Sequence, residues 1–257
     1  MSYAEYSTGF RGGGFGPRPS DAYQVRSFAP EDLRSYKVGV KSDEFDHMLT
    51  LNGAVFYSIY TNQQIGFNTI QPAGTPGAGA PWFETVNTGK SDMYGFEGEF
   101  VARPITNMLL QGSFGYLHYY RVDLGEAAGQ LLAKLPNGTV VYPPQTPEFN
   151  ASIGAQYEIP LGKDGSDGSL TPRVDWHWQS AVFFTSAVAI GQDAYSTVDA
   201  RLTWQTEDRK WAVSAYGTNI TNTYYDYGKL SLQSVLGFEQ ANPAPPAEWG
   251  LSVKRSF

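Results

Sequence analysis

The feature that most constrains the fold is a two-residue alternation of apolar and polar side chains that recurs along the whole chain. In residues 47–62, Leu51, Val55 and Tyr57 fall on one face of the pattern, and Asn52 and Ser58 fall on the other. A period of two is typical of β-strands with one apolar and one polar face. The pattern predicts about ten strands, at roughly residues 2–10, 32–41, 47–62, 87–102, 108–122, 147–159, 169–184, 195–205, 210–224 and 249–257.

The connections between these strands are by turns short and long. Short turns are predicted near 42–46, 103–107, 161–168 and 206–210, whereas 63–86, 123–146 and 225–245 are predicted to be long loops. Antiparallel barrels of bacterial outer membranes have short turns on the periplasmic side and longer loops outside. If the last strand ends on the periplasmic side, counting the strands back from it places every short turn on that side of the membrane. The pattern therefore predicts an all-β, antiparallel transmembrane sheet.

Alternation alone leaves a second possibility, because a soluble β-sandwich also has strands with one apolar face. Strand length favours the membrane, since several predicted strands reach the ~9–11 residues that span a bilayer at a tilt. Aromatic residues make up 15% of the chain. Many gather at strand ends, where membrane proteins place an interfacial girdle. The predicted girdle residues are Tyr119, Tyr120, Trp176, Trp178, Tyr224, Tyr225, Tyr227 and Trp249.

Composition excludes two classes of protein and raises a question about the start of the chain. The formal net charge of -7 gives no electrostatic support for binding nucleic acid. No apolar run reaches the ~18 residues of a transmembrane helix. The first residues show no basic and then apolar leader, which an outer-membrane protein needs for export. Either the beginning of the protein is therefore missing, or the membrane interpretation is wrong.

No catalytic or metal-binding constellation stands out. His47, His118 and His177 are too scattered for a metal site, and neither a G-x-S-x-G elbow nor a Ser/His/Asp arrangement is present. We therefore predict no enzymatic activity, no metal and no cofactor. Polar residues of the predicted strands are expected to line a water-filled lumen: Glu97, Glu99, Arg173, Asp175, His177, Asp199 and Arg201. Asp199 and Arg201 are also expected to form an ion pair with a neighbouring strand.

Seven short motifs follow one another along the chain. They are YSTGFRGGGF at 6–15, FAPE at 28–31, YKVGVKS at 36–42, LNGAVFY at 51–57 with QQ at 63–64, YGFEGE at 94–99, YPPQTP at 142–147 and NITNTYY at 219–225. In this order they resemble the barrel of TonB-dependent outer-membrane receptors. The resemblance extends over essentially the whole chain.

The resemblance implies that residues 1–257 are a single receptor-like barrel domain, the C-terminal part of a plug-filled 22-stranded barrel. The plug domain and about half of the strands would then be absent. It also implies a place in the bacterial outer membrane, in contact with lipid. The implied function is uptake of a scarce nutrient of the ferric siderophore, cobalamin or oligosaccharide class. The TonB complex would drive this uptake through the missing plug region.

The last predicted strand ends on an aromatic residue. In the receptors that this chain resembles, such an ending resembles the signal read by the barrel-insertion machinery, which would be a further partner. The candidate signal residues are Trp249, Leu251, Val253 and Phe257. The alternative is an apolar residue that simply completes a strand.

Two other functions stay open. A passive porin-like or adhesive barrel would close with about ten strands, so its first and last strands would pair, whereas part of a larger barrel would leave both edges unpaired. A soluble sugar-binding β-sandwich would pack Trp176, Trp178 and Trp204 inside a core.

Overall fold

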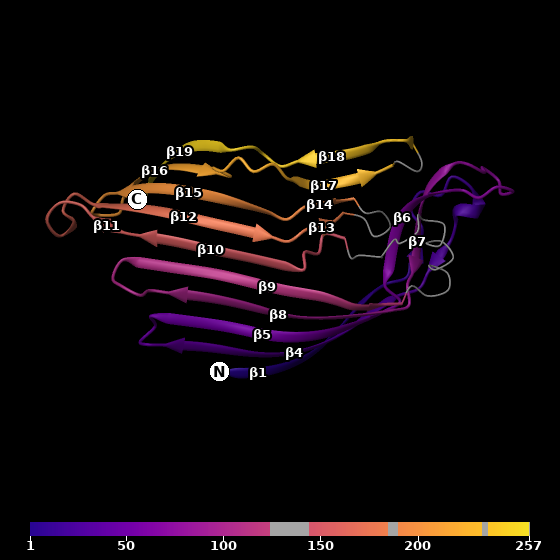
Figure 1. Cartoon of the computed structure of the whole chain (residues 1–257), viewed down its shortest axis with the longest axis horizontal. Coiled ribbons are helices and arrows are strands. Elements are labelled where there is room, and N and C mark those ends of the chain that lie inside the picture. Colours follow the sequence, from indigo (N-terminus) through magenta and orange to yellow (C-terminus); the bar gives the residue numbers. More distant parts are fainter. Residues whose placement is uncertain (124–143, 185–189, 233–235, 257) are drawn as a thin grey trace.

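One antiparallel sheet of eleven strands forms most of the computed structural model, which describes residues 1–123, 144–184, 190–232 and 236–256 (Figure 1). Ten of its strands are long, and they lie side by side in the order of the chain. These are β1 (Ser2–Arg11), β4 (Glu31–Glu44), β5 (Leu49–Thr61), β8 (Lys90–Ala102), β9 (Met108–Val122), β10 (Phe149–Tyr157), β12 (Ser169–Gln179), β15 (Tyr195–Gln205), β16 (Trp211–Thr218) and β19 (Glu248–Arg255). The short β11 (Ile159–Pro160) follows β10 and pairs with β12. The ten strands predicted from alternation are confirmed, but two end earlier than predicted, β12 at Gln179 and β16 at Thr218.

The short turns all lie at one end of the sheet and the long connections at the other (Figure 1). The β4–β5 turn lies at 45–48, slightly later than predicted, because β4 continues to Glu44. Phe45, Asp46 and His47 close this turn in the left-handed region, with φ of 55°, 54° and 66°. The turn after β11 contains the 3-10 helix η2 (Lys163–Gly165). Short and long connections therefore alternate as the sequence predicts.

The long connections contain structure that the sequence analysis missed. The segment 63–86, predicted to be a loop, contains the hairpin of β6 (Gln64–Ile70) and β7 (Pro81–Asn87). The segment 225–245 contains the hairpin of β17 (Asp226–Ser231) and β18 (Glu239–Pro243). Two smaller hairpins and a 3-10 helix lie in other long connections: β2 (Gly14–Phe15) with β3 (Ser27–Phe28), β13 (Val182–Phe183) with β14 (Gly191–Gln192), and η1 (Ala22–Gln24). Most of the predicted loop 123–146 is outside the described residues.

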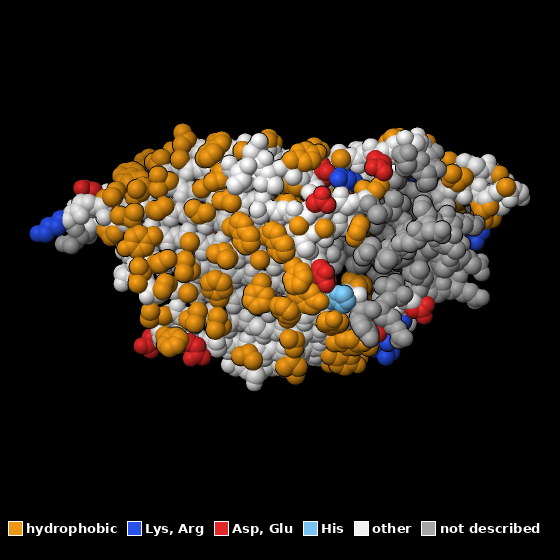
Figure 2. All heavy atoms as spheres, in the orientation of Figure 1, with side chains coloured by type: hydrophobic (Ala, Val, Ile, Leu, Met, Phe, Trp, Pro, Cys, Tyr) orange, Lys and Arg blue, Asp and Glu red, His pale blue; other side chains and the backbone are white. Residues whose placement is uncertain are grey.

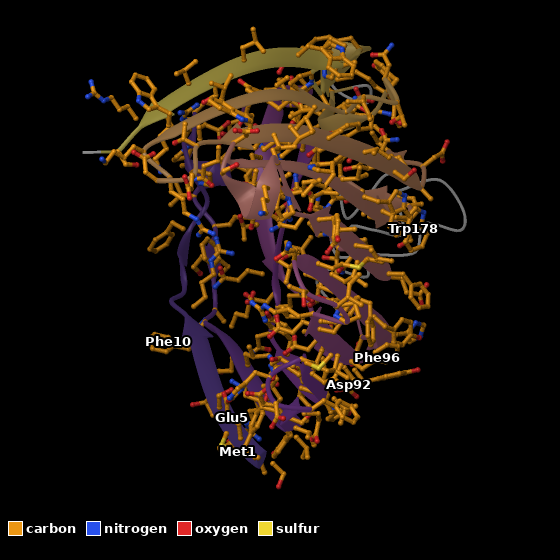
Figure 3. The ribbon with its side chains drawn as sticks, turned by 90° about the vertical axis from the view of Figure 1, so that its left-hand side faces the viewer. Met1, Glu5, Phe10, Asp92, Phe96 and Trp178 are labelled. Atoms are coloured by element: carbon orange, nitrogen blue, oxygen red, sulfur yellow. The ribbon has the colours of Figure 1, made fainter. Side chains whose placement is uncertain are left out.

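The sheet has one apolar and one polar face, because residues paired across neighbouring strands point to the same side. On β4, β5 and β8, one row is Val38, Val55 and Phe96, and a row on the other face is Lys41, Asn52 and Glu99. Apolar side chains cover much of the face seen in Figure 2. The sheet is curved, and Phe96 and Trp178 point away from its inner side (Figure 3). The convex face is therefore apolar and the concave face polar.

Within the described residues, no second layer of protein packs against the convex face. The buried apolar side chains among the described residues come from the concave face or the long connections: Ala54, Ile65, Trp82, Met93, Val182 and Ile190. On the convex face, Val55 is 59% exposed and Trp204 is 37% exposed. The tryptophans that a soluble sandwich would bury are therefore on an open surface, and the sandwich hypothesis is wrong. Such a face fits an apolar solvent better than water.

The two edges of the sheet do not meet. Within the described residues, β1 pairs with β4 alone and β19 with β16 alone, and no pairing joins β1 to β19. The ten long strands thus form an open arc, and the alternative of a barrel closed by these strands is wrong for this structure. In the part of the chain that the structure describes, no helix has the length and apolarity needed to cross a membrane.

The two faces predict opposite responses to an added charge on β5. We expect Val55→Arg, on the convex face, to lower the free energy of unfolding in lipid vesicles by about 2–4 kcal/mol, because it places a guanidinium in hydrocarbon. Asn52→Arg, three residues away on the concave face beside Glu99, is the matched control and is expected to be tolerated. Chemical denaturation of the vesicle-bound chain measures both. Equal losses would contradict the assignment of the faces.

Candidate functional site

The concave face carries charged and amide side chains on neighbouring strands. Lys37 on β4 reaches across β5 to form an ion pair with Glu97 on β8. Asn52 on β5 donates a hydrogen bond from Nδ2 to Oε1 of Glu99 at 2.6 Å. Both glutamates therefore lie on the polar face, as the sequence predicts. Groups that pair laterally in this way suit a surface in contact with water or with polar ligands.

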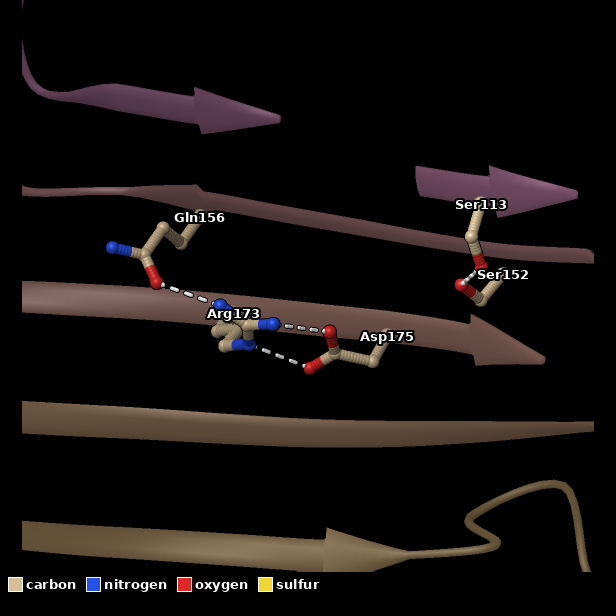
Figure 4. Close-up of polar contacts among 5 residues, drawn as sticks. All are labelled: Ser113, Ser152, Gln156, Arg173 and Asp175. Carbon is tan, nitrogen blue, oxygen red and sulfur yellow. Dashed lines mark hydrogen bonds and ion pairs between the residues drawn. The ribbon is translucent and has the colours of Figure 1, made fainter. Parts of the chain in front are cut away.

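A second polar cluster centres on Arg173 of β12 (Figure 4). Its Nε and Nη2 donate to the two carboxylate oxygens of Asp175 at 2.7 and 2.5 Å, and its Nη1 donates to Oε1 of Gln156 at 3.0 Å. The two charged side chains are 26% and 23% exposed. The planar guanidinium makes a bidentate pair, which is stronger and more directional than a single contact. This cluster fixes one cation and one anion in the wall.

The predicted ion pair of Asp199 and Arg201 with a neighbouring strand is wrong. Asp199 Oδ1 accepts a hydrogen bond from the backbone N–H of Asn219 at 2.8 Å, and the Arg201 guanidinium lies 4.9 Å from the centre of the Tyr216 ring. The described residues give neither side chain a salt bridge. The reason is register, because β12 places Arg173 opposite Arg201 and Asp175 opposite Asp199. Like charges face each other, so the pair forms within β12.

An uncharged hollow of ≈ 320 Å³ opens on the same face. The hydroxyls of Ser113 on β9 and Ser152 on β10 lie 2.8 Å apart beside it (Figure 4). His177 of β12, predicted to line a lumen, is part of its wall. Apart from Ala151 and Trp178, whose side chains lie on the convex face, the residues that line the hollow are Ser113, Asn150, Ser152, His177, Gln179, Tyr195, Thr197 and Tyr225. We call it the uncharged hollow.

Stacked tyrosines form one side of the uncharged hollow. The rings of Tyr195 and Tyr225 are 4.2 Å apart at 15°, and Tyr227 meets Tyr225 edge-on at 5.5 Å. The pKa of Tyr225 is raised mainly by burial of the side chain away from water, and to a smaller extent by its hydrogen bond with Tyr227. Its hydroxyl therefore stays protonated near neutral pH. Ring stacking and a retained hydroxyl give this wall both an apolar and a hydrogen-bonding surface.

The aromatic band on the convex face is broader than predicted. Tyr36, Tyr57 and Tyr94 form one row across three strands, and Tyr116 contacts Phe149 with ring centres 4.6 Å apart. His118 lies in this band beside Tyr94 at 5.4 Å. Alternating aromatics on one exposed face are typical of a membrane–water interface.

The predicted girdle residues divide between several locations. Trp176, Trp178 and Trp249 lie on the convex face. Tyr119 instead pairs opposite Met93 on the concave face, and the side chain of Tyr120 lies outside the described residues. The other three follow β16, outside the main sheet, and so do not belong to the band: Tyr224, Tyr225 and Tyr227.

The long connections are tied to one another by buried polar contacts. Gln24 of η1 donates to Oε1 of Gln71, which follows β6, at 2.9 Å, and Gln71 donates to Asp21 at 2.8 Å. Asp21 also accepts hydrogen bonds from the backbone N–H groups of Tyr23 and Gln24, which caps η1. The two glutamines are only 2% and 1% exposed. The β1–β4 connection and the β6–β7 hairpin therefore form one packed unit.

A second tie joins the last two long connections. Asp226, at the start of β17, is 5% exposed and forms an ion pair with Lys229 at 3.1 Å. Lys229 also donates to the backbone oxygen of Gly191 at 2.9 Å, and the backbone N–H of Asp226 donates to Gln192 at 2.9 Å. These contacts hold the β17–β18 hairpin against β14, next to Tyr225.

Three of the candidate insertion-signal residues share the convex face of β19. Trp249, Leu251 and Val253 are 71%, 80% and 66% exposed, and they pair opposite small or apolar residues of β16. Phe257 lies outside the described residues.

The three histidines lie on separate elements. The described residues contain no cluster of three or more His, Cys, Asp or Glu side chains that could hold a metal ion.

Comparisons with known proteins point to one family. Residues 1–220 match the family model described as TonB dependent receptor-like, beta-barrel. The pesticin receptor of Yersinia pestis is 21% identical over 236 residues, which are 91% of this chain and 31% of that protein. The chain therefore spans about a third of the length of this relative.

Solved structures show the same fold. The ferric yersiniabactin uptake receptor FyuA from Yersinia pestis matches all of this chain and 35% of its own, with a TM-score of 0.75 and 19% identity. The siderophore receptor PiuA from Acinetobacter baumannii matches 99% of this chain and 33% of its own, with a TM-score of 0.68 and 17% identity. At these identities the likeness concerns the fold alone.

The Arg173 cluster predicts a measurable coupling energy. In a double-mutant cycle of Arg173→Met and Asp175→Asn, we expect a coupling of about 1 kcal/mol in the free energy of unfolding, because the pair is bidentate and mostly shielded. The control pair is Arg209–Glu158, 3.8 Å apart with Arg209 73% exposed, for which a coupling close to zero is expected. Couplings of the same size in both cycles would argue against a specific role for the Arg173 cluster.

Proposed function

The chain belongs to the family of TonB-dependent receptor-like β-barrels, and from that premise we propose that it forms part of the wall of an outer-membrane importer for a scarce nutrient. Proteins of this family lie in the outer membrane of Gram-negative bacteria, and this chain is an outer-membrane β-barrel protein. Its relatives are receptors and transporters, so the prediction that it is not an enzyme is confirmed.

One observation carries the proposal, namely the separation of the two faces of a single sheet. The convex face is apolar and bears an aromatic band, which suits contact with outer-membrane lipid. The concave face bears the ion pairs and amides described above, which suit a lumen through which a polar ligand passes. A wall with these two faces divides a hydrophobic solvent from an aqueous path.

The unpaired edges support a larger wall. Backbone donors and acceptors on β1 and β19 have no partner strand on their outer sides within the described residues. In hydrocarbon such groups cost several kcal/mol each. We propose that residues 1–257 act as one receptor-like barrel domain and that further strands of the same wall satisfy these edges.

The proposed ligand class and energy source are supported by the likeness to receptors of this family. FyuA is a ferric yersiniabactin uptake receptor and PiuA is a siderophore receptor. For this chain, the proposed ligand is a small nutrient of the ferric siderophore, cobalamin or oligosaccharide class. The residues of this chain build barrel wall, so we propose that the TonB complex acts on it through a plug domain.

Uptake in the source bacterium tests this function. Cells with the intact gene are expected to accumulate at least one of three labelled probes, which are ferric yersiniabactin, cyanocobalamin and maltoheptaose. A strain that lacks the gene is the control. A protonophore is expected to abolish the difference, because the energy comes from the proton-motive force. Accumulation that the protonophore leaves unchanged would favour a passive pore, and no difference for any probe would contradict the importer.

We further propose that Trp249, Leu251, Val253 and Phe257 are read by the barrel-insertion machinery. The exposed convex row on β19 supports it, because that row stays accessible beside the open edge. We expect Phe257→Ser to reduce the heat-modifiable, folded fraction recovered from outer membranes. Lys254→Ser on the concave face is the matched control. A folded fraction that Phe257→Ser does not change would overturn the assignment.

A further inference from the structure

The uncharged hollow differs from the rest of the concave face in its chemistry. It is formed where β9, β10, β12 and β15 meet the segment after β16. A second hollow of ≈ 500 Å³ on the same face is lined by Lys37, Lys41, Glu97 and Glu99. The uncharged hollow has no Lys, Arg, Asp or Glu among its described lining residues. The absence of charge is therefore a local property, since the neighbouring part of the wall has charges of both signs.

Several polar groups of the uncharged hollow have no hydrogen-bond partner among the described residues. Within the described residues, the side chains of Asn150, His177, Gln179 and Thr197 form no hydrogen bond. Together they present amide, imidazole and hydroxyl groups, which both donate and accept. Such a set matches a ligand that also donates and accepts at many positions, such as a polyol.

Charged groups near the uncharged hollow are already engaged. Arg173 is held by Asp175 and Gln156, and Arg201 lies over Tyr216. An anionic ferric chelate would lose water here without gaining a cation, which is costly. The electrostatics favour a neutral ligand.

The tyrosine stack supplies the apolar contact that a neutral polyol needs. Sugar rings have an apolar face of C–H groups and a rim of hydroxyls. Tyr195 and Tyr225 provide a ring wall, held in place because Asp226 and Lys229 tie the β17–β18 hairpin to β14. Tyrosine loses little conformational freedom on binding and combines a ring face with a hydroxyl.

We propose that the uncharged hollow binds a neutral, hydroxyl-rich ring, so that the imported nutrient belongs to the oligosaccharide class and not to the anionic ferric chelates. The ring stacks on the Tyr195–Tyr225 wall, and its hydroxyls bond to Asn150, His177 and Thr197. This inference rests on the proposed function as an importer and selects among its ligand classes.

Calorimetric titration of the full 257-residue chain in detergent micelles tests the inference. The neutral probes are maltoheptaose, xylohexaose and chitohexaose, and the anionic probe is ferric tris(catecholate). We expect at least one neutral probe to bind. Tyr225→Ala should weaken that binding by about tenfold, from the loss of a stacking contact, and Tyr225→Phe should largely retain it. Thr197→Val, which keeps the shape and removes the hydroxyl, should weaken it several-fold, whereas Tyr57→Ala on the convex face should not change it.

Far-UV circular dichroism and heat-modifiable mobility show whether each variant is folded. If Tyr225→Ala does not fold, Thr197→Val decides the outcome. Three results would overturn the inference: no binding of any neutral probe, binding that Tyr225→Ala and Thr197→Val leave unchanged, or binding of ferric tris(catecholate) that the same variants weaken. The last result would leave the importer intact and replace only the ligand class.

Discussion

In the part of the chain that the structure describes, the apolar side chains of the convex face meet no second layer of protein, and the remaining features of the structure follow from that. A water-soluble chain of this size would bury such side chains in a core. Here they alternate outward on every strand, while the opposite face holds ion pairs and amides. In hydrocarbon every backbone group must be paired within the protein, which explains the long strand ladders from β1 to β19 and the lack of long helices among the described residues. The connections leave the sheet at its two ends, where water is available.

Much of this fold could be predicted from the sequence, because period-two alternation is a strong signal in strands of ten or more residues. The hairpins β6–β7 and β17–β18 could not. Clustered Gly and Pro residues dominate the segment 63–86, and Gly74, Gly77 and Gly79 do adopt the positive φ of 85°, 74° and 84° that turns require. The strands flanking these turns are short, and their pattern alone does not distinguish them from loop.

The sequence predicts which face of the sheet carries the candidate site, but it does not predict which side chains contact one another there. Alternation placed Glu97, Arg173 and His177 on the polar side correctly, whereas the partner of each charge depends on register between strands. The opposition of Arg173 to Arg201 is visible only once β12 and β15 are paired. Tyr119 follows the alternation of β9, because it lies one residue beyond His118 and therefore on the opposite, concave face. The uncharged hollow is lined by residues from five separate segments, and no pattern of spacing along the chain predicts it.

The most direct test of the account is the accessibility of single side chains on β5 in lipid vesicles. The natural chain contains no cysteine, so single cysteines introduced in turn at positions 51 to 57 can each carry a spin label without background. The account predicts that collisions with oxygen, which concentrates in lipid, peak at Leu51, Val55 and Tyr57. Collisions with a water-soluble nickel complex should peak at Asn52 and Phe56, on the opposite face. Equal exposure of both faces to the nickel complex would contradict the central claim that this sheet separates lipid from water.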